Sequence, residues 1–266
     1  MNYIIKNIFF SVLLVAIIEL LLITNISDFF IGVLFLGASF FLSLSVGGQS
    51  FTLARLPFLF IIGWFLFFYL TPGEIIGKGF LFVTGGVFFI AFCVSNYFSS
   101  LYKILPNITG EDSQDFIKKY EFARNLILAL LFLVAFIWYT DAFIIYSVLG
   151  LPFYITLLVI FSITFFLSSF VLKVYSISDK ADLNQEFLLY AWTSGLVIGQ
   201  ISWIVGFWPF GYLTAAFIIT IIYYTIISVL KEYLFGRFEK KYVIAELAFA
   251  ALIIIIIFNY TKWLPL

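Results

Sequence analysis

Uncharged apolar runs dominate the chain and recur at lengths that suit membrane-spanning helices. Residues 79–102, 142–172 and 187–230 carry no charged side chain and cover 24, 31 and 44 positions. A helix needs roughly 20 apolar residues to cross the hydrocarbon core of a bilayer. Strand-like alternation is absent, and a helix satisfies its backbone hydrogen bonds within one segment. The pattern therefore predicts an all-α integral membrane protein.

Charged and turn-forming residues divide these runs into segments of about one span each. The stretch from Ile8 reaches Ser27 without a small-x-small cleavage pattern, so we expect it to remain as the first span. The whole chain, residues 1–266, is then one transmembrane domain, a polytopic bundle of about nine transmembrane helices within a range of eight to ten. The predicted helices are residues 8–24, 29–46, 57–71, 79–98, 124–146, 151–172, 187–205, 210–230 and 243–260.

Two breaks decide the number of helices, and both contain proline. Residues 125–172 are interrupted only by Asp141 and by Gly-Leu-Pro at 150–152. One helix of that length would measure about 72 Å, against a hydrocarbon core of about 30 Å, so two spans are required. Residues 187–230 must also fold back, and residues 206–211 supply the glycine, proline and aromatic side chains of an interfacial turn.

The basic residues predict an orientation for these helices. Of the 14 Lys and Arg residues, 12 fall in alternate gaps, on the side that holds the N-terminus. Because Lys and Arg are retained in the cytoplasm during insertion, we expect the N-terminus inside and the C-terminus outside. The inside residues are Lys6, Arg55, Lys103, Lys118, Lys119, Arg124, Lys173, Lys180, Lys231, Arg237, Lys240 and Lys241, and the outside ones are Lys78 and Lys262.

The longest polar segment, residues 99–123, is predicted to be a cytoplasmic loop with a short interfacial helix. Thr109 to Asp112 follow the Ser/Thr-x-x-acid pattern of a helix start. Acids precede bases in this segment, as the helix dipole favours, and Phe116 and Tyr120 are expected to dip into the headgroup layer. We interpret the segment as a connector, with a partner-docking site as the alternative.

Composition narrows the function classes. Hydrophobic residues make up 64% of the chain and charged residues 11%, far from the values of about half and a quarter in soluble proteins. Zero net charge and the lack of a long basic cluster argue against binding to nucleic acid. A single cysteine, Cys93, and no histidine exclude an internal disulfide and a zinc site, so no metal or cofactor is expected. Abundant Phe and a Lys excess over Arg favour a bacterial protein of the cell inner (plasma) membrane.

Three acidic residues in or near the spans are candidates for chemistry. Glu19 lies near the middle of the first span, where a carboxylate costs on the order of 3 kcal/mol. It is either a proton or cation site, a contact with a polar group of another helix, or a structural acid hydrogen-bonded in the bundle. Glu246 follows three bases within residues 237–241, so an interfacial ion pair is expected rather than a transport role. Asp141 has no base nearby in sequence and is expected in a loop rather than inside the fifth span.

The seventh predicted span carries small and polar side chains together. Gly195 and Gly199 have the Gly-x-x-x-Gly spacing that permits close backbone approach, and Gln200 is able to hydrogen-bond across such a contact. We expect ordinary packing inside the bundle, with a dimer seam or a substrate path as alternatives.

Catalytic residues are not predicted. Without histidine, acid–base chemistry would fall on carboxylates, lysine or tyrosine, and no two carboxylates share a plausible helix face within the bilayer by sequence spacing. A lipid-modifying enzyme is therefore the third choice. The favoured function is a membrane-embedded subunit or scaffold of a larger assembly, and the alternative is a small-solute or ion transporter that uses Glu19 and a polar face around Gln200. The expected partners are the lipid bilayer and proteins that contact the cytoplasmic segments 99–123, 173–186 and 231–242.

Aromatic and basic residues near the C-terminus carry a resemblance. They are Trp208-Pro209-Phe210, Tyr223-Tyr224, Gly236-Arg237-Phe238, Lys240-Lys241 and Trp263. Through them, residues 208–263 are similar to the C-terminal part of uncharacterised multi-pass membrane proteins of small-genome bacteria. The resemblance implies no activity, because that group has none assigned.

Overall fold

A computed structural model describes the segments that form most of the C-terminal half of the chain. Residues 8–24 except Val12, residues 29–46 and most of residues 79–98 lie outside the described residues, and so does Glu19, so the predictions for them stay predictions. The described residues are 51–70, 113–147, 150–179, 184–209, 211–234, 236 and 238–261, with the single residues Val12, Val87, Ile90, Ala91, Cys93, Val94, Tyr97 and Leu101.

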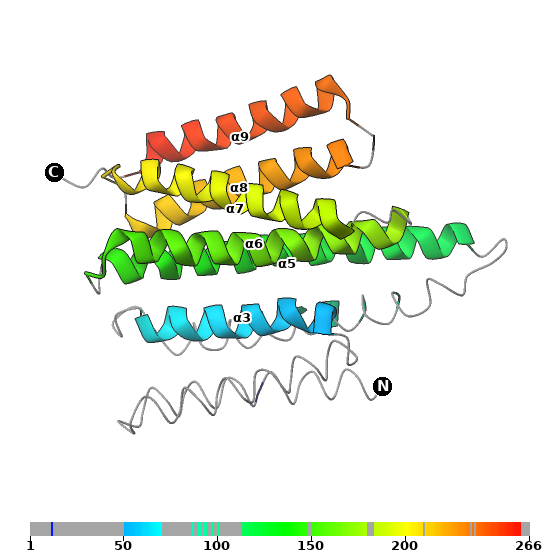
Figure 1. The fold of residues 1–266 in the computed structure, drawn as a ribbon, viewed down its shortest axis with the longest axis horizontal. Helices are drawn as coiled ribbons and strands as arrows, with labels where there is room; N and C mark the ends of the chain where they lie inside the picture. The colour runs from blue at the N-terminus through cyan, green and yellow to red at the C-terminus, as the bar shows by residue number, and fades with distance from the viewer. Residues whose placement is uncertain are drawn as a thin grey trace. The chain divides into compact units, whose positions relative to one another are not determined.

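The described segments are helical and contain no strand. Five of the helices are long and apolar enough to cross a membrane, so this part of the chain is all-helical with five candidate membrane spans. The total of nine spans and their orientation remain predictions. The helices are α3 (Phe51–Leu70), α5 (Ser113–Ser147), α6 (Phe153–Asp179), α7 (Asn184–Gly206), α8 (Tyr212–Leu234) and α9 (Lys240–Tyr260), as drawn in Figure 1.

Most of these helices extend beyond the apolar runs that predicted them. Helix α3 begins six residues before Pro57, and α6 continues past Lys173 to Asp179. Hydropathy marks only the part of a helix that suits hydrocarbon, whereas the backbone hydrogen bonds continue in the headgroup layer and in water. The loops between these helices are therefore shorter than the sequence pattern suggests.

Helix α5 shows this extension most clearly. It has 35 residues and a length of about 52 Å, well above the hydrocarbon thickness of about 30 Å. Residues 113–123, the C-terminal part of the predicted loop, form its first turns and are continuous with the fifth predicted span. Tyr120 in these turns is buried, and Phe116 is half-buried.

Both proline-containing breaks are confirmed as turns. Helix α5 ends at Ser147 and α6 begins at Phe153, while α7 ends at Gly206 and α8 begins at Tyr212. Gly150 has φ of +63°, a left-handed conformation that glycine adopts without strain.

The chain divides into two compact units, Met1–Leu131 and Phe132–Leu266, with the boundary inside α5. In the N-terminal unit, α3 buries Phe60 and Ile61. The Phe60 and Trp64 rings on the same helix lie 5.7 Å apart. The C-terminal unit holds α6 to α9 and the second half of α5. There α6 packs along α7, α8 packs on α7 and α6, and α9 packs on α8 (Figure 1).

Aromatic contacts show that the helices of the C-terminal unit alternate in direction. At one end, the Phe153 ring is 4.8 Å from Tyr146 and 6.4 Å from Phe207. Trp208 is 5.3 Å from Phe258 at the same end. The turn between α5 and α6, the turn between α7 and α8, and the C-terminal end of α9 therefore lie together.

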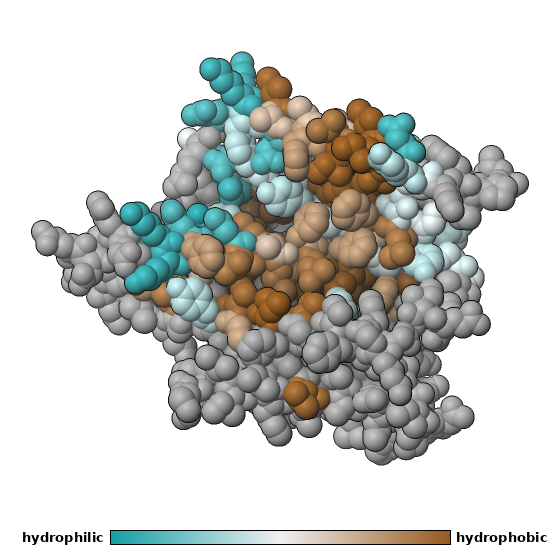
Figure 2. All heavy atoms as spheres, turned by 180° about the vertical axis from the view of Figure 1, so that it is seen from behind, coloured by the Kyte–Doolittle hydropathy of each residue, from teal (hydrophilic) through white to brown (hydrophobic). Residues whose placement is uncertain are grey.

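The opposite end gathers the described bases of this unit. Lys231 Nζ lies 5.2 Å from the ring centre of Tyr175, which joins the C-terminal ends of α8 and α6. Tyr190, near the start of α7, and Phe238, just before α9, both have ring contacts with Tyr233. Lys173, Lys231, Lys240 and Lys241 thus share one end, as the charge pattern predicts. In Figure 2, apolar side chains occupy the middle of the described surface and hydrophilic ones lie toward its margins.

Candidate functional site

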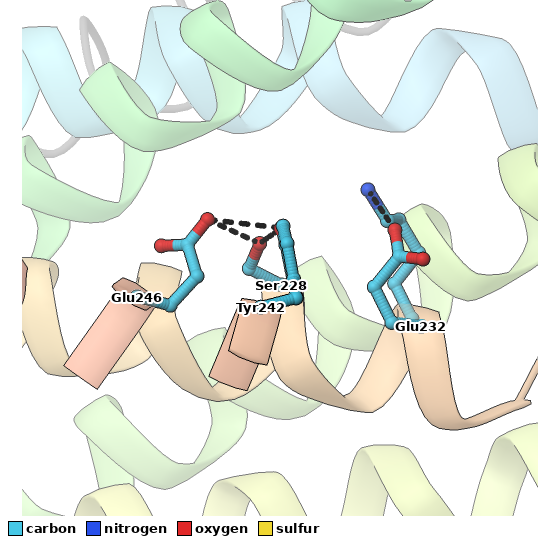
Figure 3. A network of polar contacts seen from close by, with 5 residues as sticks. Ser228, Glu232, Tyr242 and Glu246 are labelled. Carbon is cyan, nitrogen blue, oxygen red and sulfur yellow. Dashed lines mark hydrogen bonds and ion pairs between the residues drawn. The ribbon is translucent and has the colours of Figure 1, made fainter. Parts of the chain in front are cut away.

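A polar cluster joins α8 and α9 inside a membrane-spanning segment. Tyr242 and Glu246 are four residues apart on α9 and therefore share the face turned toward Ser228 of α8. The Tyr242 hydroxyl donates to Glu246 Oε1 at 2.9 Å, and Ser228 Oγ lies 2.7 Å from the Tyr242 hydroxyl and 3.3 Å from Glu246 Oε1 (Figure 3). We refer to these three residues as the α8/α9 cluster.

One hydrogen atom on each hydroxyl gives the α8/α9 cluster a direction. Ser228 and Tyr242 can each donate only once, so the shorter distances select a relay from Ser228 to Tyr242 to Glu246. Both short contacts of Glu246 use Oε1. Oε2 of this half-buried carboxylate accepts no hydrogen bond from the described residues.

The ion pair predicted for Glu246 does not form among the described residues. Lys240 and Lys241 are exposed, and Glu246 instead accepts a hydrogen bond from the Tyr242 hydroxyl. The reason is helical geometry: Lys240 and Lys241 lie about 240° and 140° around α9 from Glu246, whereas Tyr242 lies only about 40° away. Arg237 lies outside the described residues.

Basic and acidic side chains border the α8/α9 cluster at the end of α8. Lys231 Nζ and Glu232 Oε1 are 2.9 Å apart, and both side chains are partly exposed. A pair with this exposure contributes no more than about 1 kcal/mol. Its position beside the Tyr175 ring marks the polar end of the C-terminal unit.

A second polar group is buried between α5, α6 and α8. The Tyr139 hydroxyl is 2.8 Å from Thr164 Oγ1, and Thr164 also donates to the Ile160 carbonyl at 2.6 Å. The Tyr139 ring meets the Tyr223 ring edge-on, with centroids 6.2 Å apart. The Tyr223 hydroxyl is directed at Ser168, yet neither of these two hydroxyls completes a well-formed hydrogen bond.

Asp141 lies inside α5, which overturns its predicted position in a loop. Its side chain is 1% exposed, and neither carboxyl oxygen has a hydrogen-bond partner. Helix α5 continues for six residues past Asp141, because the apolar residues that follow it sustain the helix to Ser147. The sequence shows this acid within an apolar run, but the spacing alone does not reveal that it is fully enclosed.

The two glycines of α7 differ in their surroundings, because Gly195 packs against a neighbouring helix and Gly199 does not. A Cβ atom at Gly195 would lie 3.0 Å from the Phe161 ring and 3.2 Å from the Phe161 carbonyl oxygen on α6. At Gly199 no atom lies within 4 Å of such a Cβ. Gln200 is exposed and, among the described residues, makes no cross-helix hydrogen bond. The predicted polar face therefore points away from the packed side of α7.

Metal ligands do not gather in this part of the chain. No group of three or more cysteine, aspartate and glutamate side chains is placed to hold a metal ion among the described residues. Cys93 is half-buried.

Comparison with known proteins finds a family but no activity. A family model described as "Protein of unknown function (DUF5656)" matches residues 113–260, which is more than half of the chain. No curated protein and no solved structure matches the chain significantly. The match is in line with the resemblance to uncharacterised proteins, whereas a bacterial source and multi-pass relatives remain expectations.

Proposed function

The chain belongs to the DUF5656 family, whose description names no activity, and we propose that it is a non-enzymatic, membrane-embedded subunit or scaffold of a larger assembly. The membrane is proposed to be the bacterial inner (plasma) membrane, on the strength of the Lys-rich, Phe-rich composition. A partner is proposed to contact this chain mainly within the bilayer and secondarily at the cytoplasmic segments.

The position of α9 is the observation that carries the proposal. Only 6% of its most apolar stretch is buried inside the structure, against 56% for α8, although the two helices are similarly apolar. Helix α9 packs on α8, and its outer face carries exposed large side chains. They are Ile244, Leu247, Phe249, Leu252, Ile255, Ile256 and Tyr260.

Lipid alone would cover the apolar face of α9, but it would not satisfy the α8/α9 cluster. Glu246 is half-buried, and its Oε2 accepts no hydrogen bond from the described residues. Hydrocarbon supplies no donor, and polar side chains in spans usually pair with other helices. A neighbouring transmembrane helix with a hydroxyl, amide or basic side chain is therefore proposed to pack against α9.

Cytoplasmic contacts with a partner would add to this helix packing at the polar end of the C-terminal unit. Lys173, Lys231, Lys240 and Lys241 lie there, within the predicted partner segments 173–186 and 231–242. The segment 99–123 is proposed as a third contact. These segments are short, so a partner would meet helix ends rather than a folded cytoplasmic domain.

The test is the size of the particle that the chain forms after mild detergent extraction. Ala248 is exposed on α9 and Leu196 is exposed on α7, so Ala248→Trp and Leu196→Trp each add bulk to an outward face. Native mass measurement should show a complex larger than one chain for the wild type and for Leu196→Trp, and a single chain for Ala248→Trp. A wild-type protein that is alone and monomeric would contradict the proposal.

The transporter alternative is less well supported in the described part of the chain. Gln200 faces outward from α7, so the predicted polar face does not line an interior path there. Glu19 lies outside the described residues. Flux in proteoliposomes that is lost in Glu19→Gln and in Gln200→Leu would nevertheless favour this alternative over the assembly.

A further inference from the structure

Asp141 is a buried acid of α5 that the proposed function does not use. It lies six residues before the end of α5, about 9 Å along the helix axis from Ser147. Its side chain is 1% exposed, and both Oδ1 and Oδ2 are without a hydrogen bond. A buried polar group without a partner is rare, and in a membrane-spanning segment it marks a functional position by default.

The face of α5 that carries Asp141 is not the face that packs on α8. Phe132, Phe136 and Tyr139 make the ring contacts with α8, with centroid separations of 5.6, 5.9 and 6.2 Å. Asp141 is two residues beyond Tyr139 and therefore lies about 200° around the helix from it. The hydroxyl groups of Tyr139, Thr164 and Tyr223 are thus on the other side of α5.

The nearest positions on the same face of α5 offer no polar partner. Ile137 and Trp138 are one turn before Asp141, and Ile144 and Ile145 are one turn after it. The Trp138 indole is the one polar donor among these four, and neither carboxyl oxygen of Asp141 accepts a hydrogen bond from it. Thr140, the preceding residue, uses its hydroxyl to bond the Phe136 carbonyl at 2.8 Å. The carboxyl group is therefore surrounded on its own helix by aliphatic and aromatic side chains.

The described bases of residues 132–266 are too far away to pair with Asp141. Thr156 of α6 donates to the Ala142 carbonyl, which places Thr156 beside this part of α5. Lys173 is 17 residues farther along α6, about 26 Å along its axis. Lys231, Lys240 and Lys241 lie at the same distant end.

An unpaired carboxylate inside a membrane-spanning helix is strongly unfavourable on insertion scales, so a positive partner would offset a large penalty. With 1% exposure, the group is closed to a side chain of another protein, so a charge partner from outside the chain would have to be as small as a single ion. We propose that Asp141 is a binding site for a small monovalent cation, either a proton or Na⁺. The inference is independent of the assembly role proposed for α9.

Carbodiimide labelling in native membranes tests the site. A fluorescent cyclohexylcarbodiimide reacts with a carboxylic acid in apolar surroundings: the acid proton passes to a carbodiimide nitrogen and the carboxyl oxygen bonds the central carbon. The resulting O-acylisourea rearranges to a stable N-acylurea without loss of atoms. Peptide mass spectrometry would locate the adduct, with Asp141→Asn as the variant that cannot react there.

Two salts distinguish the two cations. Labelling of Asp141 that is equal in NaCl and in choline chloride would identify the proton. Na⁺ would be identified if NaCl suppresses the labelling, or if NaCl raises the melting temperature of the purified wild type but not of Asp141→Asn. The proposal is overturned if Asp141 is unlabelled in both salts and the two proteins show the same salt dependence of melting.

Discussion

Two acids in the same unit show what residue spacing reveals and what it conceals. Glu246 has a hydroxyl four residues earlier in the chain, and the structure brings that Tyr242 hydroxyl to 2.9 Å. This contact was readable from the sequence, although the bases at 240 and 241 were the more obvious partners. Asp141 has no polar neighbour at helical spacing, so its burial depends on the tertiary packing and could not be predicted.

Gly195 and Gly199 are expected to differ sharply as substitution sites. Gly195→Leu places a side chain against the Phe161 ring and backbone and should cost about 1–3 kcal/mol through overpacking. Gly199→Leu meets open space and should change stability little. Thermal unfolding in detergent measures both, and equal melting temperatures for the two variants would show that Gly195 is not a packing contact.

The relay in the α8/α9 cluster predicts a cost for removing one hydroxyl. Tyr242→Phe deletes the donor to Glu246 and the acceptor for Ser228, and should destabilise the protein by about 1–3 kcal/mol. Tyr260→Phe is the matched control on α9, because Tyr260 is 87% exposed. If both variants melt at the wild-type temperature, the cluster does not stabilise the α8/α9 contact.

At the scale of the helix, apolar runs and proline breaks located six described helices, but not their ends. Hydropathy does not register helical turns that continue into water. It therefore did not predict that residues 113–123 belong to α5 and residues 173–179 to α6. The face that each helix buries was also hard to predict. Tyrosine, tryptophan and phenylalanine are abundant on both the packed and the exposed sides, so amphipathic patterning is weak in these helices.

The contact between α5 and α6 rests partly on one buried hydroxyl pair. Tyr139→Phe removes the hydrogen bond to Thr164 and should destabilise the protein by about 0.6 kcal/mol, with an upper bound near 1.7 for bonds between membrane helices. Tyr146→Phe is the control, since Tyr146 is exposed and contributes a ring contact with Phe153. Melting temperatures that fall equally in the two variants would argue against the hydroxyl pair.

At the scale of the whole molecule, the strongest prediction from the sequence concerns the alternation of spans. The 12 to 2 distribution of Lys and Arg required that successive helices reverse direction, and the contacts from Tyr146 to Phe258 show this reversal within the C-terminal unit. The distribution of Lys and Arg does not predict which spans pack against each other. That arrangement depends on local features such as the Gly195 contact with Phe161.

Cysteine accessibility in intact cells tests this central claim most directly. In a Cys93→Ser background, single cysteines at Leu151 and Phe207 lie in the turns at one end of the unit, and cysteines at Phe238 and Glu239 lie at the other. A membrane-impermeant maleimide should label positions 151 and 207 in intact cells, and positions 238 and 239 only after permeabilisation. Labelling of all four positions in intact cells, or of 238 and 239 alone, would contradict the predicted orientation of the spans.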